Sequence, residues 1–148
     1  MASEVPRERA IGIFKPSATE RIKAKSREKR ERREERPGNS EEHLAALRKC
    51  PCVATLKMPA GEVHHLKWNT GERGIGRRSS DKWGLPITRG PHDEIERAGA
   101  RNEHAKLAEF GIENPLDLAA ALWSASPDVR RMTKIILEWK GLGRAGAK

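Results

Sequence analysis

The chain has 148 residues, of which 36% are hydrophobic and 34% charged, and its formal net charge is +9. This composition allows one modest domain with a charged tail, and the positive charge indicates an anionic partner, nucleic acid being the first candidate. We find no run that is apolar enough for a membrane span or a signal peptide, and the lack of tyrosine excludes a tyrosine nucleophile.

Residues 1–40 form a basic segment that predicts a DNA-binding arm. Between Arg7 and Arg36 the chain has twelve Lys or Arg residues but only six Glu. Bulky apolar side chains are too few there to build a core, so we expect the arm to be disordered or conditionally helical. The alternative is a solvated tail that binds nothing specifically. The DNA-binding candidates in the arm are Arg21, Lys23, Lys25, Arg27, Lys29, Arg30, Arg32 and Arg33.

Residues 41–148 are predicted to form an α+β domain. Ser40 has the side chain of a helix cap, and we expect a short helix after it that ends near Arg48. Two short strands are then predicted, at 50–58 and at 61–68, because apolar residues recur between turn-forming Pro and Gly residues.

A loop and four helices are expected to complete this domain. The loop from 69 to 81 is rich in Gly, Ser and Arg, which suits contacts with a phosphate backbone. Its candidates for such contacts are Arg73, Arg77 and Arg78. A helix is predicted to begin at Pro91, with Asp93 and Glu94 in its first turn. Three more helices are predicted near 103–110, 115–124 and 127–140.

Two adjacent histidines and a later histidine–glutamate pair carry the chemistry of this sequence. His64 and His65 lie in the second predicted strand, whereas His92 and Glu96 are spaced to share one face of a helix. Two imidazoles and a carboxylate can hold one divalent metal ion, and the remaining histidine can act as a base. Neighbouring strand residues face opposite ways, so these residues alone do not decide which of the adjacent histidines is the ligand.

Five short motifs follow one another along the chain between about residues 48 and 123. They are Cys50-Pro51-Cys52, His64-His65-Leu66, the stretch from Gly76 to Asp81, Leu85-Pro86-Ile87, and His92. In this order they resemble the HNH (ββα-metal) endonucleases, in particular the small phage nucleases of the recombination-enhancement (Ref) type. The resemblance implies a small ββα-metal core with additional C-terminal helices. It also implies that His64, His92 and Glu96 bind the metal and that His65 is the general base.

Two departures from the motif affect the expected chemistry. Glu96 stands where the motif usually has a histidine, and a carboxylate favours harder ions such as Mg²⁺ or Mn²⁺. Asp81 is nearest to the place of the motif's asparagine, with Asn69 as a weaker candidate, so we expect Asp81 to support the site together with Glu62. Cys50 and Cys52 either form half of a structural zinc site or are two small buried side chains.

The expected activity is that of a metal-dependent DNA endonuclease or nickase that hydrolyses phosphodiester bonds with one divalent ion (Mg²⁺, Mn²⁺ or Zn²⁺). The resemblance implies DNA and a recombinase–DNA filament as partners. It also implies the cytoplasm of a bacterial host cell, where two cysteines without a secretory signal would stay reduced. We expect a monomer that does not contact membranes. The alternatives are a non-catalytic nucleic-acid-binding protein with a structural metal site, and an interaction module that presents Trp123 or Trp139.

Overall fold

A computed structural model of the protein describes residues 15–72 and 78–142. The chain divides into two units, one that ends at Arg33 and one that begins at Glu34, and each is described by itself. This division precedes the expected boundary at residue 40. The reason is that Asn39 and Ser40 belong to the second unit, where the Asn39 side chain accepts a hydrogen bond from the backbone of Asp81 and the Ser40 N–H donates to the Asp81 carboxylate.

The described part of the basic arm is a helix, α1 (Ala18–Glu34). Ser17 and Glu20 cap its start reciprocally, each side chain accepting a hydrogen bond from the backbone N–H of the other. Ion pairs one turn apart support it, with Arg27 Nε 2.9 Å from a Glu31 oxygen. Among the described residues of this unit none is buried. A helix is one of the two forms expected for the arm, while residues 1–14 lie outside the described part.

Within its described residues, the second unit contains a two-stranded antiparallel sheet. Helix α2 (Glu41–Lys49) precedes it, and Ser40 caps this helix as predicted, accepting a hydrogen bond from the His43 N–H. Strand β1 (Glu62–His65) pairs with β2 (Gly84–Ile87) so that His64 faces Leu85 and His65 faces Gly84. A short 3₁₀ helix, η1 (Asp81–Trp83), leads directly into β2.

The strand predicted at 50–58 is wrong. This segment forms turns whose backbone hydrogen bonds stay largely local, as between the Leu56 N–H and the Cys52 carbonyl, 2.8 Å apart. Proline at position 51 has no N–H to donate, which removes one potential ladder bond from such a strand. The partner of β1 is instead β2, which lies beyond the long loop.

The helices after the sheet follow the predicted order. The second and third begin at the predicted residues 103 and 115, whereas the starts of the first and the last are shifted by two residues. Helix α3 (Arg89–Ala98) begins two residues before Pro91, and this proline is tolerated because N–H groups of a first turn have no partner within the helix. Consequently the acidic residues at 93 and 94 lie beyond the first turn. The remaining helices are α4 (Glu103–Glu109), α5 (Pro115–Ala125) and α6 (Val129–Trp139). Helix α6 is capped by the Asp128 side chain rather than started by Pro127.

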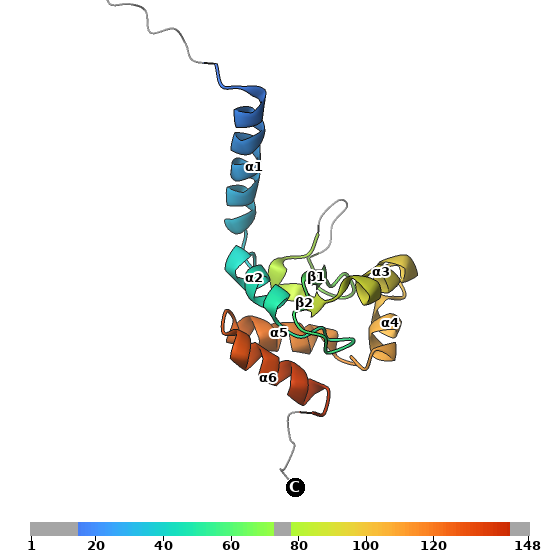
Figure 1. The fold of residues 1–148 in the computed structure, drawn as a ribbon. Coiled ribbons are helices and arrows are strands. Elements are labelled where there is room, and N and C mark those ends of the chain that lie inside the picture. The colour runs from blue at the N-terminus through green and yellow to red at the C-terminus, as the bar shows by residue number, and fades with distance from the viewer. Residues whose placement is uncertain (1–14, 73–77, 143–148) are drawn as a thin grey trace, which may run out of the picture. The chain divides into compact units, whose positions relative to one another are not determined.

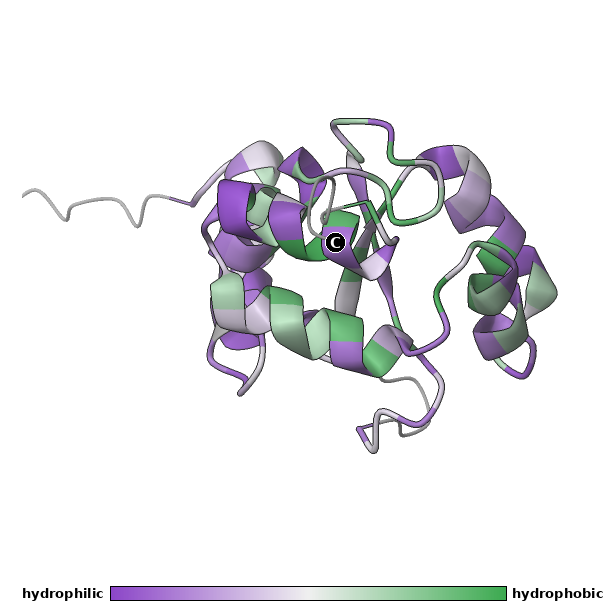
Figure 2. Cartoon of the chain, turned by 90° about the horizontal axis from the view of Figure 1, so that it is seen from below, coloured by the Kyte–Doolittle hydropathy of each residue, from purple (hydrophilic) through white to green (hydrophobic). Residues whose placement is uncertain are grey.

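Helices surround the sheet and form one hydrophobic core with it. Helices α2 and α5 contact the strands and α6 contacts α2 and α5, whereas α3 contacts β1 and α4 contacts α3 (Figure 1). Figure 2 shows hydrophilic and hydrophobic residues alternating along the helices, as amphipathic packing requires. All four residues of β2 are buried. The largest fully buried side chains include Leu47, Leu66, Leu85, Ile87, Ile95, Leu107, Ile112, Leu118, Leu122, Met132 and Ile136.

Candidate metal centre

The strand β1 and the helix α3 bring three potential metal ligands together. His64 lies in β1, and His92 and Glu96 lie one turn apart on the same face of α3. Each offers one ligand atom, and these atoms all lie within 4.8 Å of one another. The two imidazole rings meet edge to face, with their centroids 5.3 Å apart. A search of the described residues for three or more His, Cys, Asp or Glu side chains that could hold a metal ion finds this group.

The ring of His64 is buried and held by a carboxylate on one side only. Its Nε2 is 3.0 Å from an oxygen of Glu103, which itself is 2% exposed. Its Nδ1 has no hydrogen-bond partner in the structure, although it lies 3.3 Å from Oε1 of Glu96. A proton on Nε2 leaves a lone pair on Nδ1 that faces a carboxylate oxygen, an arrangement that a cation between the two atoms would stabilise.

His92 repeats this arrangement from the helix side. Its Nδ1 is 2.8 Å from an oxygen of Glu62, and its Nε2 is 3.8 Å from the same Glu96 oxygen that faces His64. Histidine ligands of metals commonly donate their second nitrogen to a carboxylate, which orients the ring and raises its basicity. Both histidines have this second partner, so the donor set fits a divalent ion.

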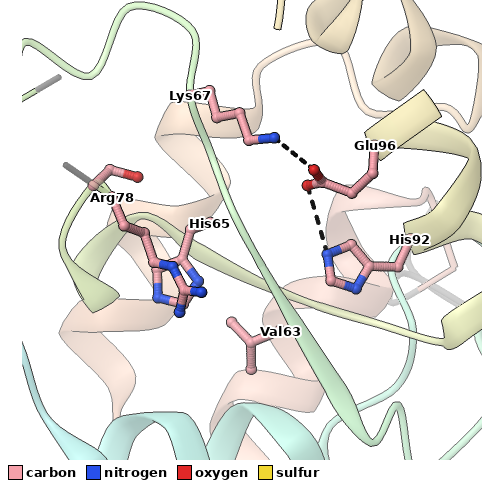
Figure 3. A pocket seen from close by; sticks show the side chains of 7 residues that line it. Val63, His65, Lys67, Arg78, His92 and Glu96 are labelled. Carbon is pink, nitrogen blue, oxygen red and sulfur yellow. Dashed lines mark hydrogen bonds and ion pairs between the residues drawn. The ribbon is translucent and has the colours of Figure 1, made fainter. Parts of the chain in front are cut away.

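The carboxylate of Glu96 is ready to bind a cation. Its Oε2 lies 2.7 Å from the Nζ atom of Lys67 (Figure 3). Burial acts to raise the pKa of Glu96, but the hydrogen bond and charge of Lys67, with the nearby imidazoles of His64 and His92, hold it below its ordinary value. Glu96 is therefore ionised at neutral pH, as a metal ligand must be.

His65 forms a separate pair with Asp81. The His65 Nε2 is 2.8 Å from Oδ1 of Asp81, a carboxylate that is buried where η1 begins. The N–H of Ser40 donates to the other oxygen of this carboxylate, and the backbone N–H of Asp81 donates to Asn39. With its proton on Nε2, His65 has Nδ1 left to accept a proton, as in other histidine–aspartate pairs.

A cleft of about 360 Å³ connects the two histidine groups. Figure 3 shows that Lys67, His92 and Glu96 lie on one side of the β1 strand as drawn, with His65 and Arg78 on the other. The residues that line this cleft are Val63, His65, Lys67, Arg78, Ser79, His92 and Glu96. It therefore joins two residues of the possible metal centre, the His65 ring held by Asp81, and two cationic side chains.

Glu103 is the site residue that sequence reasoning missed. It begins α4, and its carboxylate accepts hydrogen bonds from His64 and from the backbone N–H groups of Lys67 and Trp68. Burial acts to raise its pKa, but these hydrogen bonds hold the pKa below its ordinary value. In the sequence Glu103 looks like any acidic residue in the first turn of a helix, so no local pattern marks it.

The other candidate residues differ in where the structure places them. Arg78 lines the cleft, whereas Arg73 and Arg77 lie outside the described residues. The basic candidates of the arm lie on α1, in the first unit. Cys50 and Cys52 are buried and belong to no potential three-ligand metal group within residues 15–72 and 78–142. The Cys52 thiol instead accepts hydrogen bonds from Thr88, which suits a small core side chain.

Comparisons of the chain with protein-family models, with curated proteins and with solved structures found no match. The class of this protein is therefore defined by its fold and site alone. It is an α+β protein in which an antiparallel strand pair and the following helix carry a possible His-His-Glu metal centre. None of the helices in the described parts of the chain is long and apolar enough to cross a membrane.

Proposed function

We propose that the protein is a metal-dependent DNA endonuclease or nickase of the HNH (ββα-metal) type. The observation that carries this proposal is one cleft lined by His65, which is held by Asp81, and by His92 and Glu96 of the possible metal centre. Hydrolysis of a phosphodiester needs a base for water and positive charge near the phosphate and the leaving oxygen. The cleft supports both requirements.

The roles of the residues follow from their contacts. His65 accepts a proton from water on Nδ1 while Asp81 holds its Nε2–H and stabilises the resulting imidazolium. The water oxygen forms a bond to phosphorus as the bond to the leaving oxygen breaks, which yields a phosphate monoester and an alkoxide. The alkoxide takes a proton from solvent to become an alcohol, and His65 later returns its extra proton to solvent. His64, His92 and Glu96 would hold a divalent ion, which when bound would supply positive charge near the phosphate.

Two basic side chains give the cleft affinity for a phosphate backbone. Arg78 and Lys67 both line it, as His65 does. Figure 3 labels all three side chains among those that line the cleft. A guanidinium can bind two oxygens of one phosphate, which orients the diester as well as attracting it. The proposed substrate is DNA, and the resemblance of the motifs makes a recombinase–DNA filament the substrate form to include in the test.

The test is cleavage of supercoiled plasmid, with and without a recombinase filament, by wild type, His65→Ala and Asp81→Asn. Each protein is titrated with Mg²⁺, Mn²⁺ and Zn²⁺. We expect metal-dependent nicking or linearisation by wild type, and a loss of roughly 10²–10⁴-fold for His65→Ala, the usual contribution of a general base. His104→Ala is the matched control, because His104 stacks on Trp68 and does not line the cleft. Cleavage that is unaffected by His65→Ala would contradict the assignment of the base.

A second candidate function has its own structural support. His64 and Glu103 are both buried and connect β1 to α4, so a metal ion at His64 would hold β1, α3 and α4 together. A nucleic-acid-binding protein with a purely structural metal would show metal-dependent melting temperature and DNA binding but no cleavage with any of the three ions. That result would favour this second candidate over the nuclease.

A further inference from the structure

Lys67 lines the same cleft as His92 and Glu96 of the possible metal centre. It follows β1 closely, and its backbone N–H donates to Glu103, the same carboxylate that holds His64. Its side chain is 29% exposed and lines the cleft. The Nζ atom reaches Oε2 of Glu96 at 2.7 Å, a contact drawn as a dashed line in Figure 3.

The two oxygens of Glu96 have different partners. Oε1 faces the two ligand histidines, at 3.3 Å from His64 Nδ1 and 3.8 Å from His92 Nε2. Oε2 is held by Lys67. A divalent ion bound by the three ligands would therefore share the Glu96 carboxylate with the ammonium group of Lys67. The proposed nuclease activity does not by itself require this ammonium group.

We propose that Lys67 is a positioning residue that restricts Glu96 to one-oxygen ligation and weakens metal binding by its charge. The proposal rests on the metal centre of the proposed nuclease. Lys67 orders the Glu96 side chain, and this ordering favours metal binding only modestly, since it involves one side chain. Repulsion between an ammonium group and a divalent ion a few ångströms away is the larger effect, even in a surface-like dielectric.

The consequence is a metal site whose occupancy is adjustable. Without Lys67, both oxygens of Glu96 would be free to bind one ion, and the local charge would be lower by one. Because Lys67 also faces the cleft, the same ammonium can pair with a phosphate that enters there. Lys67 thus keeps the metal exchangeable and presents a cation on the side from which the substrate arrives.

The experiment is calorimetric titration of Mn²⁺ and of Zn²⁺ into the full-length wild type, Lys67→Met, Lys67→Gln and Lys67→Arg. We expect Lys67→Met and Lys67→Gln to bind each ion about tenfold more tightly than wild type, and Lys67→Arg to stay close to wild type. The matched control is Lys106→Met. Lys106 also bridges carboxylates, at 2.9 Å from Glu109 and 3.6 Å from Glu94, but it does not line the cleft.

The direction of the change in metal affinity distinguishes the proposed role of Lys67 from a purely structural one. Weaker or unchanged metal binding by the two neutral variants, with melting temperatures close to wild type, would overturn the proposal for Lys67. An equally large increase in affinity for Lys106→Met would also overturn it, because net charge alone would then explain the effect. Absence of binding by every protein, wild type included, would instead overturn the metal centre and with it the proposed nuclease.

Discussion

At the scale of single residues, three carboxylates fix the orientation of three histidines, the two that line the cleft and the buried His64. Each histidine has one nitrogen held by a carboxylate from another part of the second unit. The pairs are His64 with Glu103, His65 with Asp81, and His92 with Glu62. A histidine whose second nitrogen is held in this way keeps one tautomer and one orientation, which both a metal ligand and a general base require.

The buried ring of His43 makes the stability of the fold depend on pH, and this dependence can be measured. His43 is 1% exposed, packs edge to face on Trp123, and neither ring nitrogen has a hydrogen-bond partner in the structure. Burial lowers its pKa to about 4, against the opposing attraction of Asp81 and with a further contribution from His65. The folded protein therefore binds this proton less readily than the unfolded chain does.

This lowered pKa means that the protein loses stability as the pH falls. The neutral ring of His43 stabilises the fold fully above pH 6.5, and this stabilisation is lost as the pH falls towards 4. We expect the free energy of unfolding of wild type to fall by about 3 kcal/mol more than that of His43→Leu between pH 7.5 and pH 4. Urea denaturation of both proteins at several pH values checks this, and parallel pH profiles would contradict it.

At the scale of elements, the junction of η1 and β2 lies opposite His65 in the sheet. Gly84 is the first residue of β2 and pairs with His65. A Cβ atom placed there would lie 2.8 Å from Val63 Cγ1, 3.0 Å from Leu47 Cδ1 and 3.1 Å from the Asp81 carbonyl oxygen. The absence of a side chain therefore lets α2, β1 and Asp81 approach one another closely.

We expect Gly84→Ala to destabilise the protein by roughly 1–3 kcal/mol, the usual cost of overpacking a core. Gly90→Ala is the matched control, because Gly90 lies in α3 and a Cβ there has no atom within 4 Å. This control is expected to be neutral or to stabilise by up to about 1 kcal/mol, since alanine favours helix. Urea denaturation compares the two, and an equal effect of both substitutions would refute the role of close packing at Gly84.

At the scale of the whole molecule, the distribution of charge suggests how DNA would be attracted. Helix α1 has exposed basic side chains but no buried face, so it has no packing role within its own unit. The cleft of the second unit contributes Lys67 and Arg78. If α1 contacts phosphates, its cations release counterions from DNA and make the affinity steeply salt-dependent.

Replacing Lys23, Lys25 and Lys29 by glutamine is expected to weaken DNA binding and to reduce the slope of log K against log salt. The slope falls by about 0.9 for each phosphate that the protein no longer neutralises. The matched control replaces three exposed basic residues of α6, Arg130, Arg131 and Lys134, and so removes the same charge. Fluorescence anisotropy at several salt concentrations measures both slopes. An equal reduction in the two variants would mean that net charge, rather than α1, sets the salt dependence.

The distance in sequence between two interacting residues explains which features could be predicted. His92 and Glu96 were predicted to share a helix face because their spacing is a local property of α-helices. The cap at Ser40 was predictable for the same reason. By contrast, Glu103 meets His64 across 39 positions and Lys67 meets Glu96 across 29. Contacts of this range depend on how elements pack, and one sequence does not specify that packing.

By itself, the sequence determined the α+β class, the approximate extent of the later helices, the basic arm, and the candidate ligands His92 and Glu96 together with one of the two adjacent histidines. Each of these follows from composition, helix signals or residue chemistry, which act over a few positions. Only the tertiary structure decided that β1 pairs with β2 and that Glu62, Asp81 and Glu103 each hold one histidine. Strand pairing and buried hydrogen bonds are selected by burial in a common core, and that core exists only when the whole unit has folded.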